Sequence, residues 1–128
     1  MEYHSPIKRF PGTVILPDYL VPEQVFAIED AQFAARDYFA ANTKTDNDNA
    51  DAIKPGKHFS FLRMRSLYLP AVLLCVKEWH LENFSINGSG AQYETFPMTP
   101  ANDVGELLYW LFEELIKIYN GTNDVPNE

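Results

Sequence analysis

The sequence predicts a mainly helical α+β domain, with a small antiparallel sheet and a long amphipathic helix at its C-terminal end. Three observations lead to this class. Two long segments carry apolar residues at helical spacing, short extended segments lie outside them, and the composition is 46% hydrophobic and 14% aromatic. A chain of 128 residues with this composition buries a core without staples. We find no internal repeat, and we expect one globular domain over residues 1–121 and a disordered tail over 122–128.

The first expected elements are a short strand and a helix. Residues 10–17 contain Thr, Val and Ile, which favour an extended chain, and prolines bracket this run. An Ala-rich amphipathic helix is expected from Pro22 to about Asn42, because Pro suits the first helical position and Glu23 complements the helix N-terminus. Residues 43–57 are polar and contain a Pro-Gly turn signal, so we expect a mobile acidic loop that proteases cleave first.

The middle of the chain fits more than one structure. The run FSFLRMR, residues 59–65, alternates as a strand does, whereas the following residues have helical spacing. We favour a helix from about Leu69 to Glu78, with Pro70 in its first turn. A strand over residues 80–86 is expected next, then a turn at Asn87–Gly90, and residues 92–96 are expected to return as a hairpin.

The final helix, residues 100–119, is the most informative segment. Thr99 is expected to cap it, Pro100 to occupy its first position, and Asn120-Gly121 to end it. One set of apolar residues recurs at the spacing of a single face: Val104, Leu107, Leu108, Leu111, Leu115 and Ile118. A second set falls largely outside that face: Tyr109, Trp110, Phe112, Ile116 and Tyr119. The second set either completes the core or forms a partner-binding surface.

Candidate metal ligands do not have the spacing of known sites. Asp46, Asp48 and Asp51 fail the EF-hand pattern, because Ala50 stands at the fifth position and Asp51 where glycine is required. The three histidines, His4, His58 and His80, show no zinc-finger spacing and have no second cysteine. We expect no bound metal, and stoichiometric zinc or calcium in the purified protein would contradict this.

No catalytic constellation is present either. Cys75 lies in an apolar run, and on a helix it would not share a face with His80. The carboxylates Glu106, Glu113 and Glu114 are explained by the polar side of the final helix. Because nucleotide-binding loops and nucleophile motifs are also missing, we expect a protein that is not an enzyme and has no cofactor.

The charge balance argues against nucleic acid as a partner. The chain has 10 Lys and Arg against 18 Asp and Glu, a formal charge of -8, which repels a phosphate backbone. The basic residues that come closest to a cluster are spread along the sequence: Lys54, Lys57, His58, Arg63 and Arg65. Residues 1–11 lack the apolar core of a signal peptide, and no segment is apolar enough to span a membrane, so we expect a cytoplasmic protein.

Three segments together resemble one protein family. They are residues 10–16 (FPGTVIL), residues 76–84 with the W-x-L motif at Trp79 and Leu81, and the terminal helix with its apolar residues. In this combination the chain resembles the tail assembly chaperones of long-tailed bacteriophages, over roughly two thirds of its length. The resemblance implies a non-enzymatic protein of a phage or prophage, working in the bacterial cytoplasm. Such a protein coats the tape measure protein and helps tail subunits polymerise around it.

Two other functions fit the same features. A structural subunit of a phage neck or tail would use the apolar helix as a permanent oligomer interface. A small prophage-encoded adaptor is the third hypothesis. Incorporation separates the first two, because a chaperone is absent from the mature particle and a structural subunit is present in it.

Overall fold

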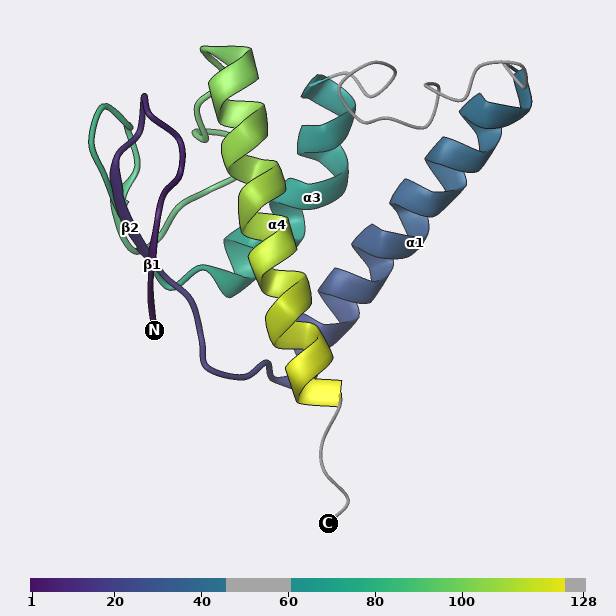
Figure 1. Ribbon diagram of the computed structural model, residues 1–128, viewed down its shortest axis with the longest axis horizontal. Helices are drawn as coiled ribbons and strands as arrows, with labels where there is room; N and C mark the ends of the chain where they lie inside the picture. The colour runs from purple at the N-terminus through teal and green to yellow at the C-terminus, as the bar shows by residue number, and fades with distance from the viewer. Residues whose placement is uncertain (46–60, 124–128) are drawn as a thin grey trace.

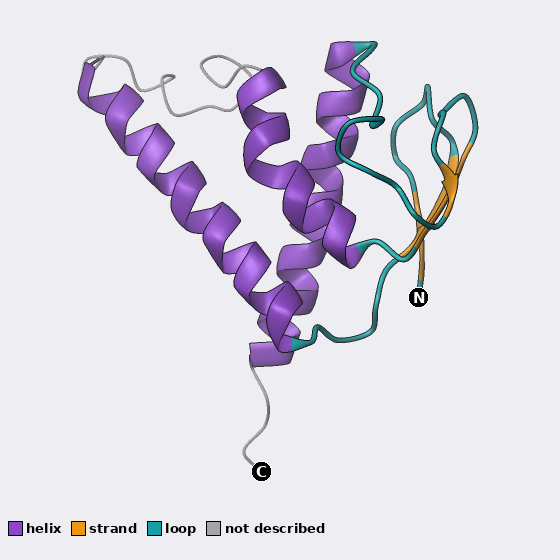
Figure 2. Cartoon of the chain, turned by 180° about the vertical axis from the view of Figure 1, so that it is seen from behind, coloured by secondary structure: helices purple, strands orange, loops and turns teal. Residues whose placement is uncertain are grey.

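The computed structural model describes residues 1–45 and 61–123, which form helices and a small antiparallel sheet as expected. The elements follow in this order: β1 (Glu2–His4), β2 (Gly12–Ile15), α1 (Pro22–Thr45), α3 (Phe61–Cys75), β3 (Glu78–Leu81), β4 (Asn87–Gly88) and α4 (Ala101–Asn123). The helices gather to one side of the sheet, and α3 lies between α1 and α4 (Figures 1 and 2). The α+β class is therefore confirmed.

The sheet has the order β1-β2-β3-β4, with every neighbouring pair antiparallel. Tyr3, Val14 and Trp79 lie in one cross-strand row, and Val14 and Trp79 are buried. The adjacent row, which contains Thr13 and His80, points the other way, because successive residues of a strand alternate between faces. One face of the sheet thus packs on the core and the other is polar.

Helix α1 begins at Pro22 as predicted, but it continues through Thr45. Residues 43–45 are therefore helical, which corrects the expected start of the loop. No Pro or Gly interrupts this part of the sequence, so nothing ends the helix at Asn42. The remainder of the predicted mobile loop, residues 46–57, lies outside the described residues, as do Asp46, Asp48 and Asp51.

Helix α3 differs most from the prediction. It starts at Phe61 and ends at Cys75, so Pro70 lies in its interior. Met64, Tyr68 and Val72 are buried at four-residue spacing, and this burial outweighs the alternating pattern of residues 59–65. Pro70 has no N–H to donate, so one hydrogen bond of the helix is lost at this position. Because Pro70 is exposed, this loss falls on the solvent side and the buried face of the helix is unaffected.

The predicted hairpin is wrong. β3 ends at Leu81, and Asn83 has a positive φ of 62°, which turns the chain before Ile86. Asn87–Gly88, expected as a turn, is strand β4 and pairs with β3, whereas residues 92–96 contain turns and no strand. Strand β1 was not predicted at all, because only Tyr3 of its three residues faces the core side.

Helix α4 starts one residue later than expected and extends to Asn123, past Gly121. The Pro100 carbonyl accepts the first helical hydrogen bond from the Val104 N–H, so Pro100 rather than Thr99 stands at the cap position. Residues 122 and 123 belong to the helix, and the rest of the predicted tail lies outside the described residues. All six residues of the predicted apolar face are buried in the core.

Candidate functional site

The structure separates the five residues predicted to bind a partner. Phe112 is only 6% exposed, and its ring stacks on Tyr68 of α3 with centroids 4.4 Å apart. Tyr119 is half-buried and its hydroxyl donates a hydrogen bond to Glu29 of α1 at 2.8 Å. Trp110 and Ile116 are partly buried against the core. Tyr109, 38% exposed, reaches the surface most.

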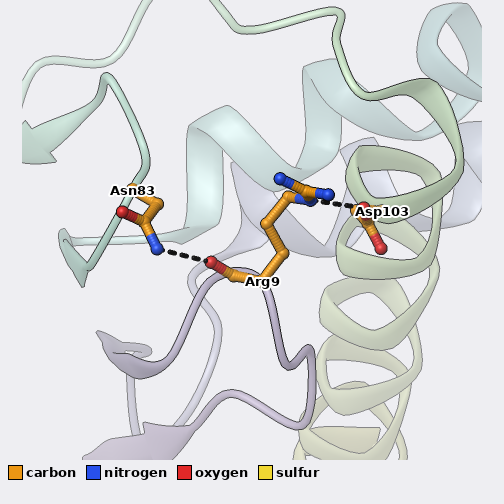
Figure 3. A network of polar contacts seen from close by, with 3 residues as sticks. All are labelled: Arg9, Asn83 and Asp103. Atoms are coloured by element: carbon orange, nitrogen blue, oxygen red, sulfur yellow. Dashed lines mark hydrogen bonds and ion pairs between the residues drawn. The ribbon is translucent and has the colours of Figure 1, made fainter.

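These residues also lie on different edges of α4. Asp103 faces the β1–β2 connection, where Arg9 Nε donates a hydrogen bond to its Oδ2 at 2.8 Å (Figure 3). Trp110 comes two helical turns after Asp103, so it lies on the same edge of α4. Phe112 and Tyr119 instead face α3 and α1. The five side chains therefore form no single surface in this structure, and most of them contribute to packing.

The contact at Arg9 is a structural tie. Besides binding Asp103 in the first turn of α4, Arg9 accepts a hydrogen bond at its carbonyl from Asn83 Nδ2, at 3.1 Å (Figure 3). Three segments distant in sequence are joined: the β1–β2 connection, the turn after β3 and the start of α4. Both side chains of the ion pair are partly exposed, so it contributes little energy but fixes how the sheet meets α4.

The candidate nucleophile and base are kept apart. Cys75 is buried in the core, and burial raises the pKa of its thiol to about 12, which leaves it protonated and unreactive at neutral pH. His80 lies on the polar face of the sheet, where its Nε2 is 2.8 Å from Glu78 Oε1. Within residues 1–45 and 61–123, no three His, Cys, Asp or Glu side chains are placed to hold a metal ion.

The carboxylates of α4 are also arranged as its polar side. Glu106 and Glu113 are exposed, and Glu114 accepts a hydrogen bond from Lys117 Nζ at 3.3 Å. Burial and, second, the charge of Glu113 raise the pKa of the Tyr109 hydroxyl above its ordinary value. Nothing in this group places two carboxylates around a common substrate position.

The dispersed basic residues do not form a patch in the described chain. Arg63 lies over the Tyr38 ring of α1, 5.2 Å from its centroid. Arg65 is only 8% exposed, and its guanidinium donates to the carbonyls of Tyr93 and Phe96 while it stacks on the Tyr93 ring. Arg65 thus holds the segment before α4 against α3. The other three, Lys54, Lys57 and His58, lie outside the described residues.

Helix α1 carries two large apolar side chains that are more than half exposed on the side away from the core. Phe26 is 61% exposed and Phe33 is 54% exposed, while Ile28, Ala31 and Ala35 on the opposite side are buried. The two phenylalanines are seven positions apart in the sequence, so they lie above one another on one face, about 10.5 Å apart along the axis. In both views α1 is the outer helix of the layer (Figures 1 and 2).

Acidic residues lie between and beside these phenylalanines. Glu23, Asp30 and Asp37 are exposed on the same side of α1 and make no ion pair within the described ranges. One cation is near: Arg36 Cζ lies 5.5 Å from the centre of the Phe33 ring. We call Glu23, Phe26, Asp30, Phe33 and Asp37 the α1 stripe. It is the candidate functional site of the described chain.

Sequence reasoning missed the α1 stripe because apolar residues of an amphipathic helix are ordinarily assigned to its core face, and Phe26 and Phe33 are apolar. The signal is present in the sequence. The acids at 23, 30 and 37 repeat every seven residues, and so do the phenylalanines, whereas Ile28, Ala31 and Ala35 follow a separate three- and four-residue spacing.

Comparisons with protein-family models, curated proteins and solved structures found no match. Among the described residues, no helix has both the length and the apolar character needed to cross a bilayer.

Proposed function

We propose that this protein is a non-enzymatic tail assembly chaperone of a phage or prophage, which works in the bacterial cytoplasm and holds a protein client such as the tape measure protein. The observation that carries the proposal is the α1 stripe. Two phenylalanines more than half exposed on one helix face, two turns apart, are what a protein needs to hold an apolar client segment.

The core is complete without these two side chains. α1 packs through Ile28, Ala31 and Ala35, which are buried, and the Tyr119 hydroxyl bonds to Glu29 on a neighbouring side of the helix. Phe26 and Phe33 therefore contribute little to folding. A formal charge of -8 keeps a chain with such a surface soluble while no client is bound. The resemblance to tail assembly chaperones names the client class.

Co-expression with the tape measure protein of the same phage or prophage tests the function. We expect the tape measure protein to be soluble when the wild-type chain is present and to aggregate when it is absent. Mass spectrometry of purified mature particles should not detect the chain. No effect on the solubility of the tape measure protein would refute the proposed function.

A structural subunit of the neck or tail is the alternative that the same experiment identifies. In that case the chain is found in mature particles in a fixed ratio to the other tail proteins. Its exposed apolar surface would then be a permanent interface between subunits.

A further inference from the structure

We propose that the α1 stripe binds a basic amphipathic helix, with apolar side chains two turns apart and Lys or Arg beside them. This inference rests on the proposed function, since it defines the chemistry of the client segment that the stripe accepts. It concerns a partner chain, because the phenylalanines of the stripe face away from the core of this one.

The spacing of the phenylalanines favours a helical partner. Phe26 and Phe33 are two turns apart, and a second helix that lies along α1 offers apolar residues at the same interval. Both phenylalanines are more than half exposed, and Arg36 lies over the ring of Phe33. Large aromatic side chains of this kind commonly supply most of the binding energy at protein interfaces.

The charges of the stripe select a basic partner. Glu23, Asp30 and Asp37 are exposed and have no ion-pair partner within the described residues. Asp30 lies between the two phenylalanines in sequence, so a Lys or Arg of the partner meets it when the apolar residues dock. Complementary charges at the edge of an interface accelerate association and exclude partners of the same charge.

A second copy of this chain is disfavoured as the occupant. In an antiparallel two-fold contact centred on Asp30, that residue meets its own copy, and Glu23 of one chain meets Asp37 of the other. A parallel contact also sets each acid against itself. Like charges at these positions oppose pairing in a chain whose net charge is already -8.

An anionic membrane surface is disfavoured for the same electrostatic reason. Helices that lie on such membranes carry Lys and Arg beside their apolar residues. The α1 stripe carries acids at these positions, with Arg36 as the nearby cation. A partner that contacts both the phenylalanines and the acids of the stripe therefore needs apolar side chains together with positive charge.

Two synthetic helices test the inference on the full-length protein. Each has about 20 residues with leucines two turns apart, and one carries lysines beside the leucines where the other carries glutamates. We expect the lysine helix to bind at least about tenfold more tightly than the glutamate helix at low ionic strength. The difference should shrink as salt screens the exposed charges. Equal affinities, or no binding of either helix, would overturn the inference.

Variants of the protein locate the binding site. Phe26→Ser with Phe33→Ser should weaken the lysine helix by at least about tenfold. Leu62→Ser on α3 is the matched control, because Leu62 is 62% exposed and lies outside the stripe, and it should leave the affinity unchanged. Binding that survives the double substitution, or that falls with Leu62→Ser instead, places the site elsewhere and refutes the assignment.

The charge requirement has its own matched pair. Asp30→Asn with Asp37→Asn should weaken the lysine helix by about 3–10-fold and flatten the salt dependence. Glu106→Gln with Glu113→Gln removes two exposed acids at the same seven-residue spacing on α4 and should have no effect. Equal effects of both pairs would show that only net charge matters, which contradicts a basic partner on α1.

Sizing and the client assay separate the remaining outcomes. A dimer of the wild-type chain that Phe26→Ser dissociates would make a second copy the occupant and overturn the inference. The proposed function fails if wild-type protein does not keep the tape measure protein soluble. The inference alone fails if that activity is present but unchanged by substitutions in the stripe.

Discussion

Replacing Phe112 by Ala should cost about 3–5 kcal/mol of unfolding free energy. Phe112 is 6% exposed and its ring stacks on Tyr68 at 4.4 Å, with an interplanar angle of 18°. Transfer of a buried side chain of this kind to water accounts for about 1.5–3 kcal/mol. The stacked pair adds about 0.5–1.5 kcal/mol. The cavity left beside Tyr68 increases the loss further, because the packed helices α3 and α4 cannot close it fully.

The same substitution on α1 provides the control. Phe26→Ala removes an equal number of atoms from a side chain that is more than half exposed, so its effect should stay within about 0.5 kcal/mol. Thermal and urea unfolding, followed by far-ultraviolet circular dichroism, measures both variants. For a domain of this size we expect Phe112→Ala to lower Tm by about 10–20 °C.

A small effect at Phe112 would refute the assignment of this residue to the core. Suppose that Phe112→Ala and Phe26→Ala lowered the free energy of unfolding by amounts within about 1 kcal/mol of each other, and that only Phe112→Ala weakened binding of the client. In that case α4 would present the docking surface. The α1 stripe would then lose its place as the candidate site. Leu111→Ala gives the reference for a fully buried residue on the same helix, at about 2–5 kcal/mol.

Three further predictions concern packing, a tie between helices and pH. Gly12→Ala should destabilise by about 2–4 kcal/mol in urea unfolding, because a Cβ would overlap a main-chain oxygen of β3 and φ is 131°. Gly88→Ala, which meets no atom, should cost only about 1–2 kcal/mol. Tyr119→Phe should lower the free energy of unfolding in urea by about 1–2 kcal/mol, since it removes the hydroxyl that donates a hydrogen bond to Glu29 of α1. An unchanged urea midpoint would contradict this. Burial raises the pKa of Cys75 and of Tyr68 to about 12, so the unfolded chain releases these protons at lower pH than the folded chain. Stability should fall as pH rises from about 9 toward 12, and less so in Cys75→Ala, whereas native Cys75 should resist alkylation near pH 8.

The sequence predicts α4 well because its signal is strong and local. Leu107, Leu111 and Leu115 recur at helical spacing without interruption, and burial of this face agrees with the propensity of each residue. α3 was predicted poorly because Pro70 and the alternating run before it suggest a boundary, whereas the packed structure keeps one continuous helix. Tertiary packing decided between these two local signals.

The sheet depended on contacts that local sequence does not contain. β1 has three residues, of which Glu2 and His4 point to the polar face, so no period is visible before β2 pairs with it. Strand β4 has only two residues, and it is extended because it pairs with β3. The candidate site was missed for another reason: Phe26 and Phe33 are apolar and helical, and apolar helical residues are usually assigned to a core.

Folding alone does not explain why α1 carries phenylalanines on its outer face. Glu, Lys or Arg at positions 26 and 33 would give higher helix propensity and remove apolar surface from solvent. Exposed phenylalanines promote aggregation of the free protein. The acids that alternate with Phe26 and Phe33 limit this tendency, since charges beside apolar residues oppose aggregation. Glu23, Asp30 and Asp37 therefore account for two properties at once. We infer that their charges oppose aggregation of the free chain and, in the proposed interaction, restrict its exposed phenylalanines to a partner that brings positive charge.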